Sequence, residues 1–231
     1  MTTLGDICAV ACAEAFFGDG RNMASPMAPL PRLGARLAKA TVAPRLVLTD
    51  GTASIVDLDG EVIGWMPFSR VFDTLWSGRR HVMMGASQID RYGNQNISAI
   101  GDWARPKVQL LGSRGAPGNT ACHPTSYFIS KHSRRIFVEA VDFASGIGPR
   151  RGAHEIRCVI TNLGVFDFKS PDQGMSVRSL HPGVTLEQAQ DATGFPLHAG
   201  DDIPTSRGPT PAEADWLERL DPGAAVRGSL S

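Results

Sequence analysis

Short strand-like runs of apolar and β-branched residues alternate along this chain with stretches that have helical spacing. The strand-like runs cover 45–49, 81–84, 108–112, 134–142 and 155–168. The helical stretches cover 3–17, 34–40, 68–78, 185–194 and 210–222. This alternation predicts an α/β fold, with an open parallel or mixed sheet flanked by helices. The runs at 134–142 and 155–168 are nearly continuous in bulky apolar residues, which predicts strands covered on both faces.

Three turns follow strand-like runs and are rich in glycine and polar residues. They are Asp50-Gly51, the segment 85–96 and the segment 112–119. In open α/β sheets, ligands bind at the carboxyl ends of the strands. We therefore expect any binding site to use these turns.

The charge balance of the chain excludes some classes of function. Lys and Arg number 23, and Asp and Glu also number 23, so the formal net charge is zero. This argues against a nucleic-acid binder, and it favours a chain that works inside a complex. No apolar run reaches the roughly 18–20 residues of a membrane span, and no signal peptide is recognisable at the N-terminus. We expect a cytoplasmic protein that does not bind a membrane.

Composition changes near the C-terminus, where the chain turns polar and rich in glycine and proline from residue 199. This predicts one α/β domain over 1–198, followed by a linker and a short helix over 199–231. Thr210 and Glu213 form the capping box that starts this helix. The four cysteines lack the spacing of metal ligands, so we predict free thiols and no metal site: Cys8, Cys12, Cys122 and Cys158.

The segment 85–96 crowds amide and carboxyl side chains around Gly93. They are Gln88, Asp90, Asn94, Gln95 and Asn96. They predict either a binding site or an elaborate turn in which Asp90 and Asn94 bond the backbone. On physical grounds alone, the turn is the favoured interpretation.

The loop 112–119, "GSRGAPGN", has the composition of a segment that presents backbone N–H groups. Gly115 and Gly118 let the chain approach a ligand closely, and Pro117 stiffens it. Adjacent free amides there would hold a developing oxyanion. The alternative is a tight turn between a strand and a helix without any ligand, and spacing alone does not separate the two.

Other motifs are incomplete. "GASQI" resembles a nucleophile elbow, but Ile89 stands where the second glycine is required, which argues against Ser87 as a nucleophile. The glycines at 18–20 and 146–152 do not match a dinucleotide fingerprint. His132 lies among Lys131, Arg134 and Arg135, a cluster that is most simply a solvated strand entry.

Four motifs in order resemble the beta subunit of family I coenzyme A transferases: "GASQIDRYGNQN", "RGAPGN", "TNLGVFDF" and "LHPGVTLEQAQDATGF". The similarity covers about 10–195. "GWMPFSRVF", "LTDG" and "SPMAPLPRLGARLA" are similar to the beta subunit of the coenzyme A transferase-like hydrolase of steroid (cholesterol) ring degradation, the IpdAB type. The resemblance implies the NagB/RpiA/CoA-transferase-like fold, a homologous alpha subunit as partner, an α2β2 assembly and an active site at the subunit interface.

One position departs from the transferase pattern. Transferases of this family carry a glutamate in a strand-end turn of the beta subunit, and it attacks the acyl-CoA thioester. The matching turn here is Thr49-Asp50-Gly51, with threonine in place of the glutamate. Threonine cannot form a glutamyl-CoA intermediate. Transferase chemistry should therefore not run on this chain, and the resemblance to the hydrolase places the catalytic glutamate on the alpha subunit.

The resemblance implies that this chain is the non-nucleophilic beta subunit of a hydrolase that opens a carbocyclic β-keto acyl-CoA ring in steroid catabolism. It requires no cofactor other than the coenzyme A of the substrate. The expected substrate-binding and oxyanion residues are Arg114, Gly115, Ala116, Asn119, Gln88, Asn94 and Asn96. Two alternatives stay open: a subunit of a 3-oxoacid or glutaconate-type CoA-transferase, and a non-catalytic partner that stabilises the alpha subunit.

Overall fold

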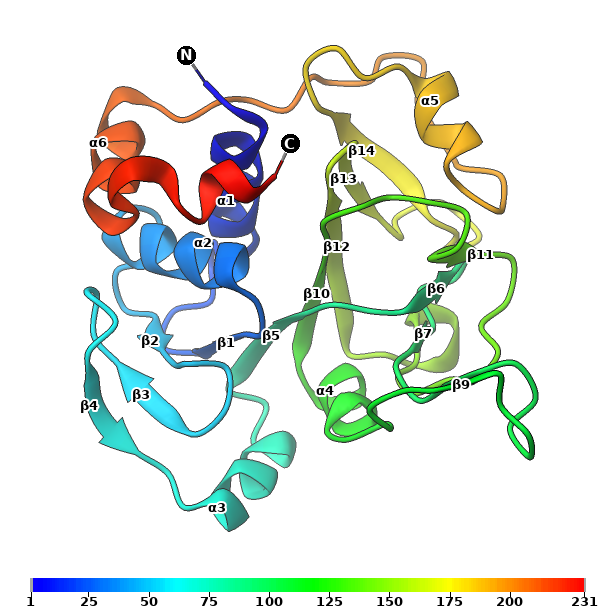
Figure 1. The fold of residues 1–231 in the computed structure, drawn as a ribbon, viewed down its shortest axis with the longest axis horizontal. Helices are drawn as coiled ribbons and strands as arrows, with labels where there is room; N and C mark the ends of the chain where they lie inside the picture. Colours follow the sequence, from blue (N-terminus) through cyan, green and yellow to red (C-terminus); the bar gives the residue numbers. More distant parts are fainter. Residues whose placement is uncertain (1, 231) are drawn as a thin grey trace. The chain divides into compact units, whose positions relative to one another are not determined.

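The structure of the protein is a computed structural model that describes residues 2–230, and the chain forms two compact units (Figure 1). Unit 1 contains the chain up to Gly85 together with the residues from Ser206 onward. Unit 2 contains Ala86–Thr205. The C-terminal helix therefore belongs to the N-terminal unit, and the division at residue 198 stays a prediction about sequence organisation. None of the helices over 2–230 is both long and apolar enough to cross a bilayer.

Unit 1 is built on three parallel strands in the order β5-β1-β2. They are β1 (Met23–Pro26), β2 (Val47–Leu48) and β5 (Arg80–Met84). Met23 pairs with Val47 on one side and with Arg80 on the other. Since the strands are parallel and in register, their carboxyl ends share one edge, and the Thr49 turn lies there.

Three helices of unit 1 pack together: α1 (Leu4–Ala15), α2 (Pro29–Ala40) and α6 (Pro211–Leu220). A capping box of Thr3 and Asp6 starts α1, and Thr210 and Glu213 start α6 in the same way. Helices α1 and α2 approach closely at Gly34, where an added Cβ would lie 2.3 Å from the Cβ of Cys12. Only glycine permits this approach.

The remaining elements of unit 1 lie between β2 and β5 and at the C-terminus. Strands β3 (Ser54–Val56) and β4 (Val62–Trp65) form an antiparallel hairpin. It is followed by α3 (Phe68–Asp73) and the 3₁₀ turn η1 (Thr74–Trp76). Two further 3₁₀ turns follow α6: η3 (Pro222–Ala224) and η4 (Arg227–Ser229).

Unit 2 contains a mixed sheet in the order β14-β13-β12-β10. Its strands are β10 (Pro124–Ile129), β12 (Glu155–Thr161), β13 (Gly164–Asp167) and β14 (Ser176–Leu180). The pair β10 and β12 is parallel, whereas β12, β13 and β14 are successively antiparallel. The apolar side chains Ile160 and Phe166 are fully buried and form part of its core.

Two small sheets and three short helices complete unit 2. One sheet has the order β11-β6-β7, and the other pairs β8 with β9. Their strands are β6 (Gln88–Asp90), β7 (Gln95–Asn96), β8 (Ala99–Ile100), β9 (Val108–Gln109) and β11 (Phe137–Val138). The helices are α4 (Ala116–Cys122), η2 (Pro149–Arg151) and α5 (Leu186–Asp191).

The structure confirms the α/β prediction with a parallel-rich mixed sheet and helices. The helix expected over 185–194 is present as α5, with Thr185 as its N-cap. The expected long strand at 134–142 is wrong, because only β11 is extended and the Ser133 carbonyl accepts the amides of both Ile136 and Phe137 in a turn. The expected helix at 34–40 starts earlier, at Pro29, because proline is well suited to the first turn of a helix.

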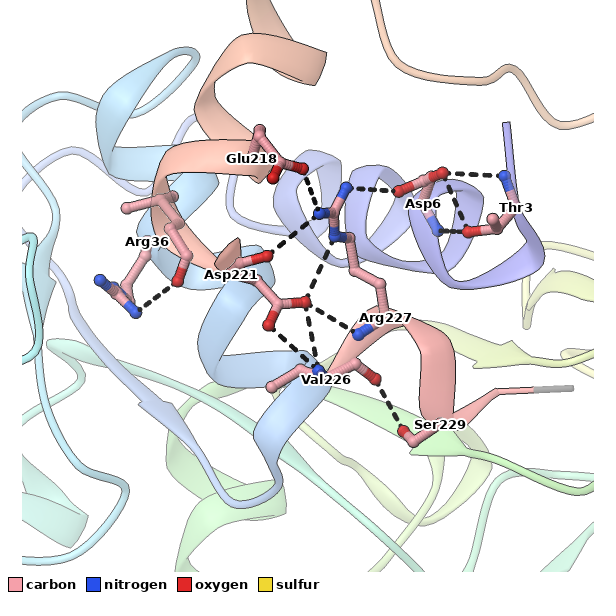
Figure 2. A network of polar contacts seen from close by, with 9 residues as sticks. Thr3, Asp6, Arg36, Glu218, Asp221, Val226, Arg227 and Ser229 are labelled. Carbon is pink, nitrogen blue, oxygen red and sulfur yellow. Dashed lines mark hydrogen bonds and ion pairs between the residues drawn. The ribbon is translucent and has the colours of Figure 1, made fainter. Parts of the chain in front are cut away.

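A buried arginine joins the two ends of the chain within unit 1 (Figure 2). Arg227 Nη1 lies 2.9 Å from Asp6 Oδ1, and its Nε lies 3.3 Å from Asp221 Oδ2. Its Nη2 also contacts Glu218 Oε2 at 3.1 Å. Asp6 and Asp221 are buried with the guanidinium, whereas Glu218 is exposed.

These contacts keep the buried carboxylates ionised. Burial alone would raise the pKa of Asp6, but hydrogen bonds from Thr3 and the Arg227 guanidinium hold that pKa below its ordinary value. Burial alone would also raise the pKa of Asp221. Hydrogen bonds from the amides of Arg227 and Val226 and from the Arg227 guanidinium hold that pKa below its ordinary value. A carboxyl whose pKa is lowered in the folded state stabilises it above its unfolded pKa and loses this contribution as the pH falls.

We expect Arg227→Gln to lower the free energy of unfolding by about 3 kcal/mol at pH 7, because it leaves two buried carboxylates without their cation. Denaturant unfolding measures the loss. The difference from the wild type should shrink as the pH falls below the unfolded pKa of about 3.8. Arg219→Gln is the matched control, since Arg219 is exposed and covers the Trp216 ring at the surface. Equal losses in both variants would contradict the role of Arg227.

Candidate functional site

The Thr49 turn follows β2 at the carboxyl edge of the unit 1 sheet. The Thr49 hydroxyl donates to the Ala24 carbonyl at 2.7 Å and accepts the Gly51 amide at 3.1 Å. The side chain is buried, so both hydrogen-bonding roles of the hydroxyl serve the backbone. Thr49 therefore holds the turn together and is not placed to act as a nucleophile.

The two residues after Thr49 also have structural roles. Asp50 Oδ1 accepts the amides of Thr52 and Ser54 at 2.8 and 3.1 Å. Burial would raise the Asp50 pKa, but these amides lower it below its ordinary value, so the carboxylate is ionised and engaged. Gly51 has φ +90°, and a Cβ there would lie 2.3 Å from the Pro26 carbonyl oxygen. The turn requires glycine at this place.

The turn between β6 and β7 in unit 2 is organised by the buried carboxylate of Asp90. Its Oδ1 accepts the amides of Tyr92 and Asn94, each at 3.0 Å, and its Oδ2 accepts Asn94 Nδ2 at 2.8 Å. Burial raises the pKa of Asp90 despite these bonds. Asn94 Oδ1 in turn accepts the Gly148 amide at 3.0 Å, which ties the turn to the segment before η2.

The amides of Gln88 and Asn96 are bonded inside the same unit. Asn96 Nδ2 donates to Gln88 Oε1 at 2.7 Å and to the Ala99 carbonyl at 2.6 Å. Gln88 Nε2 donates to Asp142 Oδ2 at 3.0 Å. Gln88, Asn94 and Asn96 are all buried, so the geometry supports the structural interpretation of this turn. Their role as walls of a substrate pocket stays a prediction.

The loop 112–119 leads into α4 at Ala116. Arg114 is exposed and has φ 49°, in the left-handed region. The Ala116 amide donates to the Ser113 carbonyl at 3.0 Å, so it is already engaged. Gly115 is half-buried, and Asn119 lies on the buried side of α4. The four predicted residues therefore lie where this loop meets the start of α4, and their contact with a substrate stays a prediction.

The hydroxyls of three serines, one of which lies in this loop, form a hydrogen-bonded chain that the sequence did not predict. Ser98 Oγ lies 2.7 Å from Ser145 Oγ and 2.9 Å from Ser113 Oγ. Ser98 and Ser145 are buried, and Ser113 is half-buried. The three residues come from separate segments, so no local sequence signal marks the chain.

Two histidines also have partners that the sequence did not indicate. His132 is buried, with Nε2 at 2.9 Å from Thr193 Oγ1 and the ring stacked on Phe137. Burial lowers its pKa to about 3, so the ring is neutral and is not part of a solvated basic cluster, which corrects the expectation. In unit 1, His81 Nδ1 lies 2.6 Å from Asp19 Oδ2, and both side chains are buried.

The described residues 2–230 contain no group of three or more His, Cys, Asp and Glu placed to hold a metal ion. Within the same range, none of the four cysteines forms a disulfide. Burial raises the pKa of the Cys8 and Cys158 thiols, which keeps them protonated.

We expect Asn94→Ala to lower the free energy of unfolding by about 2 kcal/mol, because Asp90 Oδ2 and the buried Gly148 amide lose their partner. Denaturant unfolding measures this. The control is Asn22→Ala, a half-buried asparagine of unit 1, for which a loss below about 0.5 kcal/mol is expected. Full stability of Asn94→Ala would rule out the structural role.

Comparison with known proteins gives one family match over half of the chain. The model of the coenzyme A transferase family matches residues 72–192. Among curated proteins, the cholesterol ring-cleaving hydrolase IpdB subunit of Rhodococcus jostii is 49% identical over 235 residues, covering 95% of this chain and 93% of that protein. One subunit of the 3-oxoadipate CoA-transferase of Pseudomonas knackmussii is 32% identical, covering 82% of this chain and 75% of that protein.

Among solved structures, a chain of the IpdAB crystal structure from Rhodococcus jostii matches with a TM-score of 0.93 and 47% sequence identity. The match covers 100% of this chain and 98% of that chain. The two chains therefore share the same fold over their whole length.

Proposed function

This chain belongs to the coenzyme A transferase family, and we propose that it is the beta subunit of a two-subunit hydrolase that opens a carbocyclic β-keto acyl-CoA ring in steroid catabolism. The resemblance drawn from the motifs is confirmed for the family and for its IpdAB type. In this function the substrate carries its own coenzyme A. The catalytic glutamate belongs to the alpha subunit.

The observation that carries the proposal is the state of the Thr49 turn. Covalent transfer of coenzyme A needs a carboxylate that attacks the thioester. The place of that carboxylate holds a buried hydroxyl bonded to Ala24 and Gly51, and the neighbouring Asp50 carboxylate is held by two backbone amides. This chain therefore has no nucleophile in the turn, and hydrolysis by a base on the partner is the chemistry that fits.

The reaction follows from the chemistry of a β-keto thioester. A base on the partner takes a proton from water, and the water oxygen adds to the ring ketone. The bond between the ketone carbon and the thioester α-carbon then breaks. Its electron pair moves to the α-carbon, where the thioester carbonyl delocalises it until a proton is added. The product is one open-chain acyl-CoA that also carries the new carboxylate, and donors near Arg114, Gly115 and Ala116 would stabilise the charged oxygen.

An exposed apolar segment in unit 1 supports a protein partner. Over 62–76, five large apolar side chains are exposed: Val62, Ile63, Trp65, Phe72 and Trp76. Trp65 and Trp76 are 68% and 71% exposed, and with roughly 150–250 Å² for a whole aromatic side chain the pair alone presents about 300 Å². A stable interface buries about 800 Å² on each partner. We propose that this segment packs against the alpha subunit in an α2β2 assembly.

The proposed function predicts that the complex with the alpha subunit releases ring-opened product without a carboxylate acceptor. Thr49→Val should keep kcat within about threefold, while the lost hydrogen bonds cost about 1–3 kcal/mol of stability. Product release and transfer of coenzyme A to an added carboxylate are assayed separately. A nucleophile at this position would instead lose about 10⁴-fold or more in kcat on replacement.

The same assays separate the alternatives. Transfer that depends on an added acceptor would favour a 3-oxoacid or glutaconate-type transferase. Full hydrolysis by the alpha subunit alone would favour a non-catalytic stabilising partner.

The double variant Trp65→Ser/Trp76→Ser should weaken the complex with the alpha subunit, raising Kd by about thirtyfold or more, because exposed aromatic side chains are frequent energetic centres of interfaces. Sedimentation or titration calorimetry measures Kd. Trp103→Ser is the matched control, since Trp103 is an exposed tryptophan of unit 2 outside the segment 62–76. An unchanged Kd in the double variant would rule out this docking surface.

A further inference from the structure

The chain of three serine hydroxyls in unit 2 has a defined direction. The Ile97 amide donates to Ser145 Oγ at 2.9 Å, so Ser145 Oγ is an acceptor at the start of the chain. Ser145 is 1% exposed, and among residues 2–230 the only other polar atom bonded to its hydroxyl is Ser98 Oγ. A buried hydroxyl hydrogen without an acceptor is costly. The Ser145 hydrogen is therefore donated to Ser98.

The same donor-to-acceptor direction continues from the Ser98 hydroxyl to the Ser113 hydroxyl. Because Ser98 Oγ accepts from Ser145, its own hydrogen is left for Ser113 Oγ, which lies 2.9 Å away. Ser98 is also 1% exposed, so its hydrogen has no route to solvent. Ser113 then accepts from Ser98, and among the described residues no acceptor is recorded for the hydrogen of its own hydroxyl. Ser113 is the half-buried end of the chain, and its hydroxyl hydrogen is the one that a bound ligand can take.

The position of Ser113 is held by the surrounding backbone. The Gly112 amide donates to the Ile97 carbonyl at 3.1 Å, and the Leu110 amide donates to the Ser98 carbonyl at 3.0 Å. On the other side, the Ser113 carbonyl accepts the Ala116 amide at the start of α4. The hydroxyl is thus a pre-oriented donor directly before Arg114 and Gly115. Such a donor acts without reorganisation when charge develops on an oxygen.

We propose that the Ser113 hydroxyl donates a hydrogen bond to the carbonyl oxygen of the acyl-CoA substrate on which charge develops, and that Ser98 and Ser145 are positioning residues that orient it. The proposal rests on the proposed function, since it assigns the ligand as an acyl-CoA carbonyl. It adds a side-chain donor to the loop, where the Ala116 amide is already bonded to Ser113.

The test uses the two-subunit complex with Ser113→Ala, Ser113→Thr, Ser145→Ala and the double variant Ser113→Ala/Ser145→Ala. Ser229→Ala is the control, because that exposed hydroxyl of unit 1 bonds only the Val226 carbonyl among the described residues. Unfolding midpoints confirm that each variant is folded. We expect Ser113→Ala to lower kcat by about 10²-fold and to raise KM by about tenfold, and Ser113→Thr to restore most of the rate.

The positioning role of Ser145 is tested by comparing the single and double variants. Ser145→Ala alone should lower kcat by about tenfold, because Ser98 loses its directed donor, and it should have no added effect in the absence of the Ser113 hydroxyl. A kcat of Ser113→Ala within about twofold of the wild type would overturn the proposal. Independent, multiplicative effects of the two single variants would overturn the directed chain and indicate a packing role only.

The role of Ser113 can be tested by ligand binding even if the complex proves inactive. If the wild-type complex neither hydrolyses nor transfers, the proposed function is wrong, and the affinities for acetyl-CoA and free coenzyme A decide on Ser113. A loss of about tenfold in acetyl-CoA affinity in Ser113→Ala, with unchanged affinity for coenzyme A, would uphold the carbonyl contact. Equal affinities in the variant and the wild type would overturn it.

Discussion

The buried carboxylate of Asp90 is the interaction on which the candidate site of unit 2 depends. It accepts two backbone amides and the Asn94 side chain, and Asn94 then holds the Gly148 amide. This fixes the segment that precedes η2, and Ser145 lies in the same segment. A buried charge is costly unless every lone pair is used, so one misplaced partner would disturb the whole arrangement. The many polar side chains in this turn are therefore needed to hold the loop in one defined geometry.

In the proposed function, the Thr49 turn keeps the backbone of the family fold while the chemistry differs from that of the transferases. The turn still needs Gly51, because the Pro26 carbonyl leaves no room for a side chain. Threonine satisfies the local backbone with its hydroxyl, which a longer carboxylate pointing towards substrate would not do. In the proposed function this chain lacks a nucleophile of its own and depends on a partner, and the exposed apolar side chains over 62–76 fit that dependence.

Local chemistry was predictable where it acts over a few residues. The capping box at Thr210 and the α/β alternation are confirmed, because caps and periodicity depend on neighbours in sequence. The strand expected at 134–142 failed for the complementary reason. Of its apolar residues only Phe137 is buried, and it stacks on His132 and lies in a short strand paired with β6. A turn at Ser133 stands where extended backbone was expected.

The fold class, the family and the lack of a glutamate at position 49 follow from the amino-acid sequence, since motifs of contiguous residues carry them. Which polar groups meet depends instead on how the chain folds. Ser98, Ser113 and Ser145 come from three segments, and Asp6 meets Arg227 across nearly the whole chain. Hydrogen bonds and ion pairs depend on distances of about 3 Å, and chain folding sets these distances independently of sequence separation.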